Sequence, residues 1–166
     1  MSISLAGGLS LGGAAGYWDQ EVSKAADTPR DTTIVRTVDP DLFLPLAIGR
    51  QLIELNLLCG CASATPDIRW AFAEADSLVI TAASFFFRMD SQGTLPSVET
   101  TAFDGTVDQS VILQIGAGLQ NFVNIQLVCT VTTAGTLQFR WAQNASNATP
   151  TIVLANSNMK SHRMGD

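Results

Sequence analysis

Charged side chains are scarce in this sequence of 166 residues. Asp, Glu, Lys and Arg make up 14% of it, against roughly 25% in an ordinary soluble domain. Hydrophobic residues make up 46%, so a single copy would have difficulty covering its surface with solvated groups. The composition therefore indicates a homo-oligomer or a place in a larger assembly. The alternative is that Ser, Thr, Asn and Gln supply the missing polarity.

Several functional classes are disfavoured by what the sequence lacks. The net charge is −6 and the nine Lys and Arg are scattered, whereas a nucleic-acid backbone demands clustered basic residues. No apolar run approaches the roughly 20 residues of a membrane span. The only histidine, His162, lies in a polar C-terminal tail that we expect to be solvated, where it cannot easily complete a Ser-His-Asp arrangement. We therefore expect no enzyme activity, no cofactor, and neither a nucleic acid nor a membrane as partner.

The three cysteines, Cys59, Cys61 and Cys129, do not form a disulfide framework. Cys59 and Cys61 are two residues apart, so on a strand they point to the same face with no obvious partners. We expect buried, reduced thiols. A zinc site is the alternative, but it lacks a convincing fourth ligand and no metal is expected.

Hydrophobic alternation is strongest from residue 121 to residue 143. Val123, Ile125, Leu127, Cys129 and Val131 share one face of a strand, and Leu137, Phe139 and Trp141 share one face of the next. Between them stands Thr133-Ala134-Gly135. This pattern predicts a hairpin in which Gly135 supplies a positive φ angle.

Further strands are predicted at residues 33–38, 42–46, 51–62, 68–72, 111–115 and 151–154, and residues 84–89 are either a strand buried on both sides or an oligomer contact. Asp39-Pro40-Asp41 is expected to form a turn whose carboxylates cap backbone amides, and Pro45 to place its strand at a sheet edge. With about eight or nine strands and hardly a helix, the fold class is all-β, a sandwich or jelly roll. The motif Ile68-Arg69-Trp70-Ala71 returns as Phe139-Arg140-Trp141-Ala142, which predicts that both Trp share one core. The expected core contains Trp70, Phe72, Ile125, Leu127, Val131, Phe139 and Trp141.

Residues 1–30 are rich in glycine and differ from the rest of the chain. Their five Gly disfavour a regular helix. Isolated apolar side chains, which a free tail gains nothing by exposing, stand at Leu5, Leu9, Leu11, Tyr17 and Trp18. We therefore predict an extended N-terminal arm at residues 1–30, attached through these five residues to another protein, and a β-sandwich domain at residues 31–166.

Two stretches carry a resemblance to a known group of proteins. The run Ala134-Gly-Thr-Leu-Gln-Phe-Arg-Trp-Ala-Gln-Asn-Ala-Ser-Asn-Ala-Thr-Pro-Thr-Ile-Val-Leu-Ala-Asn-Ser157 resembles the C-terminal hairpin of tailed-bacteriophage virion proteins. The earlier Asp67-Ile-Arg-Trp-Ala-Phe72 is similar to the matching region of the same group. Its members are capsid decoration (cement) proteins and head or tail fibres. The resemblance spans residues 33–160, leaves out the arm, and implies a trimeric, tumour-necrosis-factor-like (TNF-like) jelly roll.

The resemblance implies a component of the phage particle, made in the host cytoplasm and located in the virion on the capsid surface. The arm favours a cement protein whose partners are its own copies, as a homotrimer, and the major capsid protein, because an extended segment can lie in grooves between subunits. A head or tail fibre or a receptor-binding knob is the alternative, although the heptads or shaft repeats of a fibre are not visible. A trimeric jelly-roll ligand outside viruses is a third possibility.

Overall fold

The computed structural model describes residues 3–5, 9–11, 18–63, 68–90, 99–103, 111–113 and 119–165, with side chains for residues 18–63, 68–81, 84 and 121–165. The regular structure in these ranges consists of β-strands. Their bounds are β1 Ile3–Leu5, β2 Leu9–Leu11, β3 Gln20–Ser23, β4 Thr28–Arg30, β5 Thr37–Leu46, β6 Gly49–Cys61, β7 Ile68–Ala75, β8 Val79–Asp90, β9 Glu99–Phe103, β10 Val111–Leu113, β11 Leu119–Thr133, β12 Gly135–Gln143, β13 Thr151–Val153 and β14 Asn158–Arg163.

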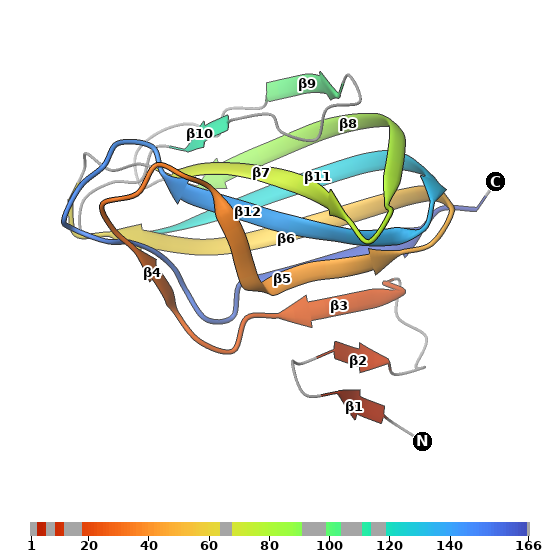
Figure 1. Ribbon diagram of the computed structural model, residues 1–166, viewed down its shortest axis with the longest axis horizontal. Helices are drawn as coiled ribbons and strands as arrows, with labels where there is room; N and C mark the ends of the chain where they lie inside the picture. Colours follow the sequence, from red (N-terminus) through yellow and green to blue (C-terminus); the bar gives the residue numbers. More distant parts are fainter. Residues whose placement is uncertain are drawn as a thin grey trace.

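Strands β3 to β14 form two antiparallel sheets that pack face to face, and β1 and β2 pair separately (Figure 1). The smaller sheet has four strands in the order β10-β7-β12-β5. The larger sheet has the order β3-β14-β6-β11-β8-β9, and β13 joins it by pairing with β6 and β4. The predicted all-β sandwich is confirmed. In the part of the chain described, no helix is long and apolar enough to cross a membrane.

The predicted hairpin of residues 121–143 is wrong, although both of its strands exist. β11 pairs with β6 and β8 in the larger sheet, whereas β12 pairs with β5 and β7 in the smaller one. The turn at Ala134 therefore carries the chain from one sheet to the other. Gly135 does not take the expected positive φ. It is needed because a Cβ there would lie 2.3 Å from the Leu78 backbone nitrogen.

The expected turn at Asp39-Pro40-Asp41 is also absent. Residues 37–46 form the single strand β5, whose register against β12 shifts between Val38, opposite Arg140, and Phe43, opposite Gln138. The β5 residues between Val38 and Phe43 outnumber those opposite them in β12, so they form a β-bulge in the antiparallel ladder. Pro45 lies in this strand at the edge of the smaller sheet, as predicted.

The C-terminal tail is not a solvated end, which corrects our expectation for it. Residues 158–163 form β14, which pairs with β6 on one side and β3 on the other. Met159 and Ser161 are buried, while Lys160 and His162 point to the other face. The sequence did not reveal this strand, because the only apolar residue between Asn158 and Arg163 is Met159 and the buried residues alternate with other polar ones.

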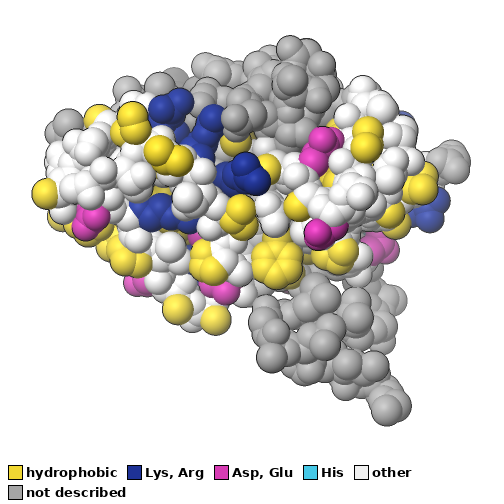
Figure 2. Space-filling model, in the orientation of Figure 1, with side chains coloured by type: hydrophobic (Ala, Val, Ile, Leu, Met, Phe, Trp, Pro, Cys, Tyr) yellow, Lys and Arg dark blue, Asp and Glu magenta, His cyan; other side chains and the backbone are white. Residues whose placement is uncertain are grey.

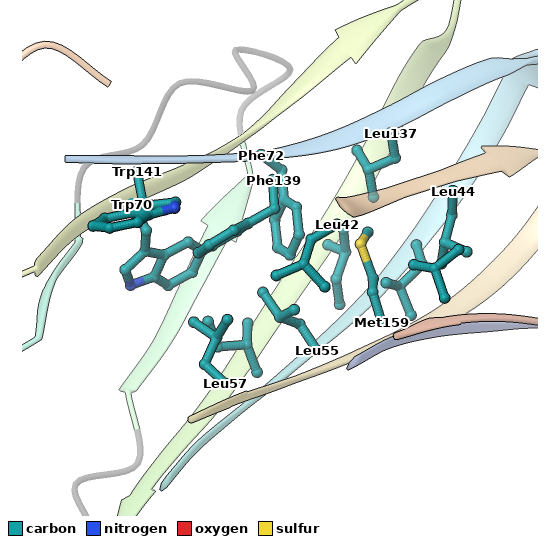
Figure 3. Close-up of a cluster of buried hydrophobic side chains, with 14 of the residues drawn as sticks. Leu42, Leu44, Leu55, Leu57, Trp70, Phe72, Leu137, Phe139, Trp141 and Met159 are labelled. Carbon is teal, nitrogen blue, oxygen red and sulfur yellow. The ribbon is translucent and has the colours of Figure 1, made fainter. Parts of the chain in front are cut away.

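The core lies between the two sheets. Side chains of the smaller sheet point toward those of the larger sheet in Figure 3, where the labelled residues include Trp70, Phe72, Phe139, Trp141, Leu55, Leu57 and Met159. All seven predicted core residues are buried, and Trp70 pairs in register with Trp141. Phe72 meets both Trp70 and Phe139 edge to face, at 5.7 and 6.0 Å between ring centroids. Such geometry adds about 0.5–1.5 kcal/mol per pair beyond the burial itself.

The second half of the predicted arm contributes strands to the larger sheet. β3 pairs with β14, and β4 pairs with β13. The first half contains the antiparallel pair β1 and β2, which lies beside β3 (Figure 1). The division of the chain after residue 30 stays a prediction, and the site described next lies on both sides of it.

Candidate functional site at the N-terminal junction

The structure describes the five residues predicted to attach the arm only in part. Leu5 lies in β1, and Leu9 and Leu11 lie in β2, but their side chains and all of Tyr17 fall outside the described parts. Trp18 is described and is half-buried. The Lys160 ammonium lies 5.9 Å from the centre of its ring, within the range of a cation–π contact. Whether the five residues bind another protein stays a prediction.

From Trp18 to Ser23 the segment meets the sandwich through β14. Val22 is buried in the core, but the charged side-chain contacts remain open to solvent. Lys160 Nζ lies 3.6 Å from a Glu21 carboxylate oxygen, and His162 Nδ1 lies 3.5 Å from one of Asp19. The Asp19 carboxylate also accepts the Arg163 backbone N–H. The Glu21 and Asp19 side chains are 48% and 53% exposed, so water and salt screen these pairs. We call this set of contacts the outer junction.

At Lys24, directly after β3, the contact between charged groups becomes completely buried. The Lys24 ammonium donates to Asp39 Oδ1 at 2.9 Å, and both side chains have an exposed fraction of 0%. It also donates to Asp41 Oδ2 at 3.2 Å, and Asp41 is 29% exposed. Breaking such a buried pair leaves an uncompensated charge in the interior and is strongly destabilising.

Trp141 and Arg30 complete the cluster. The Trp141 indole N–H donates to Asp39 Oδ2 at 3.0 Å, so both oxygens of that carboxylate are occupied. The Arg30 guanidinium lies over the Trp141 ring, 4.2 Å from its centre. It donates to the carbonyl oxygens of Thr37 and Val38, each at 2.9 Å, and to that of Trp141. We call Lys24, Arg30, Asp39, Asp41 and Trp141 the inner junction.

The inner junction is electrostatically coupled as well as hydrogen-bonded. Burial lowers the pKa of Arg30 from its ordinary value, and the nearby Asp39 charge opposes that shift. The three carbonyl oxygens replace the hydrogen bonds to water that the guanidinium loses on burial. The planar, forked set of donors of an arginine suits three such acceptors better than the ammonium of a lysine would. The cluster joins β4, β5 and β12, so the N-terminal segment is held against the edge of the smaller sheet as well as the larger one.

A small cleft opens between the edges of the two sheets, beside the outer junction. Its volume is about 210 Å³, and it is lined by Asp19, Gln20, Pro45, Ala47, Gln51, Ser161 and Arg163. The Gln51 amide donates to the Ala47 carbonyl oxygen at 2.8 Å, and Gln20 Oε1 is buried with no hydrogen-bond partner among the described residues. The cleft is large enough for one side chain of another protein.

The cysteines are free thiols, as predicted, and all three are buried. Burial raises the pKa of Cys59 and of Cys129 from 9.0 to about 12. At neutral pH these thiols are protonated and unreactive. Among the described residues, no three His, Cys, Asp or Glu side chains converge as ligands for a metal ion.

The surface carries apolar side chains from several separate segments. Ile34, Val35 and Ile48 are at least half exposed, and Phe43, Val79 and Phe122 are slightly less so. On the face shown in Figure 2, hydrophobic side chains lie singly among polar ones, and Lys and Arg gather over the smaller sheet. The described residues on this face therefore form no single large apolar patch.

Sequence reasoning missed the inner junction. It assigned Asp39 and Asp41 a capping role, and the Asp41 backbone N–H does donate to Asp39 Oδ1 at 3.1 Å. The sequence offered only one signal for more: two acidic residues directly before the apolar run Leu42–Leu46 in a chain with few charges. Nothing in the pattern points to Lys24 as their partner, because that contact depends on the path of the chain between β3 and β5.

Comparisons with known proteins give no significant match. No family model matches the chain, and neither does any curated protein or any solved structure.

Proposed function

We propose that this chain is a virion structural protein, a capsid decoration (cement) protein of a tailed bacteriophage that binds the major capsid protein as a homotrimer. The observation that carries the proposal is the inner junction. It clamps the N-terminal segment to a rigid sandwich at Lys24 and Arg30, while the apolar residues Leu5 to Trp18 all precede the clamp. A segment that is anchored to the sandwich at one end can bind the shell at its other end and so connect the projecting domain to the capsid.

The strand order supports the jelly-roll part of the proposal. The eight consecutive strands β5 to β12 divide into the sheets β5-β12-β7-β10 and β6-β11-β8-β9. This interleaving of early and late strands, with repeated crossings between the sheets, is what a jelly roll built from two Greek keys requires and so supports the proposal. We propose a TNF-like variant of it, in which β14 and β3 extend the larger sheet beyond β6.

The outer face of the larger sheet supports the homotrimer. Asn56 donates to Glu54 at 2.8 Å and to Asn158 at 3.1 Å, Asn124 donates to Asn56 at 2.7 Å, and Gln126 donates to Glu54 at 3.3 Å. These half-buried side chains form a network across β14, β6 and β11 that contains a single charge. Interface centres are depleted of charged residues, so this face suits contact with another copy.

The trimer is tested by placing a charge on this face. Asn124→Lys should reduce the trimer to monomers in sedimentation equilibrium without changing the thermal midpoint of the monomer fold, because an unpaired ammonium in an interface is costly. Gln138→Lys is the matched control, since Gln138 is a half-buried amide on the smaller sheet. A wild-type chain that stays monomeric at micromolar concentration, and that occurs as single copies on particles, contradicts the trimer.

Attachment is tested with expanded capsids that lack this protein. The chain without residues 1–17 keeps both junctions, and it should fold and yet fail to decorate the shells. Full occupancy by this truncated chain would show that the sandwich carries the attachment. Full-length protein that ignores the shells and binds host cells would favour the fibre or receptor-binding knob instead.

A further inference from the structure

The inner junction contains the groups needed to make a covalent bond. Lys24 Nζ lies 2.9 Å from Asp39 Oδ1, and a second carboxylate, that of Asp41, lies 3.2 Å from the same nitrogen. The Lys24 and Asp39 side chains have no exposed surface. An amine, an acceptor carboxyl group and a second carboxyl group that can carry protons are thus held together in the interior of a β-sandwich.

We propose that Lys24 and Asp39 condense in the folded protein to form an intramolecular isopeptide bond between Lys24 Nζ and Asp39 Cγ, with release of one water molecule. The proposal concerns a modification of this chain and does not depend on its place in a virion. No oxidant, metal or cofactor is required, because an ammonium and a carboxylate together contain every atom of the amide and the water.

The first requirement is an uncharged amine. In the proposed reaction a proton passes from Lys24 Nζ to Asp39 Oδ1 along the 2.9 Å hydrogen bond that already joins them. The products are a neutral amine and a neutral carboxylic acid. In water both groups would remain ionised and separate. Here the fold holds them next to each other, and such positioning can correspond to an effective concentration of roughly 10⁵ M or more.

The remaining steps balance with the groups in place. The lone pair of Lys24 Nζ forms the bond to Asp39 Cγ, and the electrons of the carbonyl move to Oδ2. There the Trp141 indole N–H, 3.0 Å away, stabilises the developing negative charge. Asp41 takes a second proton from the nitrogen and delivers it to the Oδ1 hydroxyl. The Cγ–Oδ1 bond breaks, water leaves, the carbonyl reforms at Oδ2, and Asp41 is again a carboxylate.

The neighbouring residues favour this pair over others. Asp39 is the acceptor because it is fully buried and receives the Trp141 donor, whereas Asp41 is partly open to water. Arg30 covers the Trp141 ring and keeps the indole in place. The chain holds a natural comparison in Lys160 and Glu21, whose atoms are 3.6 Å apart but whose side chains are 22% and 48% exposed. That pair should stay ionic.

The bond would close the chain from residue 24 to residue 39 into a covalent loop. It would tie the N-terminal segment to β5 at the edge of the smaller sheet, so that the segment could be released only by breaking a covalent bond. A buried ion pair with an extra carboxylate is a costly arrangement, and condensation removes two of its charges.

The test is mass spectrometry of the full-length protein after prolonged incubation in its folded state. The denatured chain should weigh less than its sequence by the mass of one water. Trypsin should not cleave after Lys24, and it should yield residues 1–30 joined to residues 37–50, with fragment ions placing the link at Lys24 and Asp39. Lys160 should be cleaved normally.

Variants separate the chemistry from the fold. Asp39→Ala removes the acceptor, and the linked peptide should vanish. Asp41→Asn keeps a hydrogen-bonding side chain of similar size and should fold, yet slow the reaction roughly 100-fold or more, because a proton carrier contributes at least that much. An unchanged rate in this variant overturns the role of Asp41.

Two results would overturn the proposal itself. One is a wild-type chain of full mass after incubation, with free Lys24 in its tryptic peptides. The other is a mass lower by one water without the linked peptide, since a cyclic imide at another Asp loses the same mass but leaves the two peptides separate.

Discussion

The N-terminal segment meets the sandwich at two junctions that use the same kinds of side chain in different surroundings. At the outer junction, Glu21 and Asp19 face Lys160 and His162 across β3 and β14, and the carboxylates are about half exposed. At the inner junction, Lys24 and Asp39 are completely buried and share their contacts with Trp141. The first kind of contact contributes little to stability, and the second becomes very costly when it is broken.

The difference separates contacts that solvent can replace from contacts that it cannot. The charged pairs of the outer junction can be opened by salt or by competition, because water replaces these side-chain contacts readily. The inner junction cannot open without leaving a charge inside the protein. The segment from Lys24 onward is therefore fixed to the sandwich by buried charges. β3, directly before it, also belongs to the larger sheet and buries Val22 in the core, so only the residues before β3 can act as a separate element.

The largest expected effect comes from breaking the inner junction at Asp39. Asp39→Ala should lower the free energy of unfolding by about 3–5 kcal/mol, because it leaves the Lys24 ammonium buried without its main partner. Urea unfolding measures the change. The double variant Lys24→Met, Asp39→Leu should recover much of the loss, since no charge then remains unpaired. A loss below 1 kcal/mol in Asp39→Ala would mean that the cluster is hydrated in solution.

Arg30→Met should have the next largest effect. It removes the donor to three carbonyl oxygens and the cation over Trp141, and hydrogen bonds to a charged group contribute roughly 1.5–3 kcal/mol. Arg30→Lys should recover only part of the loss, because an ammonium cannot reproduce the planar fork. Full recovery with Lys would show that the charge alone matters.

Alkaline pH tests the interior separately from the outer junction, because it ionises the buried thiols of the unfolded chain before those of the folded chain. The pKa of Cys59 and Cys129 is about 12 in the folded chain and 9.0 ordinarily, so between these values the unfolded chain loses protons that the folded chain keeps. The free energy of unfolding should therefore fall as the pH rises above 9, by about 1 kcal/mol per thiol at pH 10. In Cys129→Ala the fall should be shallower by that amount. Equal slopes in the two proteins would contradict the burial of this thiol.

The smallest effect is expected at the outer junction. Glu21→Ala should change the free energy of unfolding by less than about 1 kcal/mol, and the change should shrink further at high salt. Lys160→Ala should behave in the same way. A loss in either variant as large as that of Asp39→Ala would remove the distinction between the two junctions.

The strands and the core of this fold could be predicted from the sequence, but their partners could not. The period of two from Val123 to Val131 identified a buried face, and Trp70 and Trp141 were correctly placed in one core. Alternation says nothing about which strand lies alongside, so β11 and β12 were expected to form a hairpin although they belong to different sheets. In β14 the apolar signal reduces to Met159, and the polar residues around it concealed a strand that is paired on both sides.

The candidate site was harder to predict than the fold. Trp18 was singled out because an isolated aromatic residue in a Gly-rich segment needs a partner, and the structure places it near Lys160. Lys24 carried no signal, because a lysine in a polar segment is normally solvated. Its burial follows from the path of β3 to β5 and from an acceptor at Asp39, and contacts of that kind depend on the tertiary structure.

The most direct measurement compares thermal unfolding of two shortened chains. Without residues 1–17 both junctions remain, so one cooperative transition should occur within a few degrees of the full-length midpoint. Without residues 1–30, Asp39 loses Lys24 and Trp141 loses Arg30, so the midpoint should fall by roughly 10 °C or more, or the chain should not fold. Equal midpoints in the two shortened chains would contradict the claim that the sandwich includes the segment from Lys24 onward.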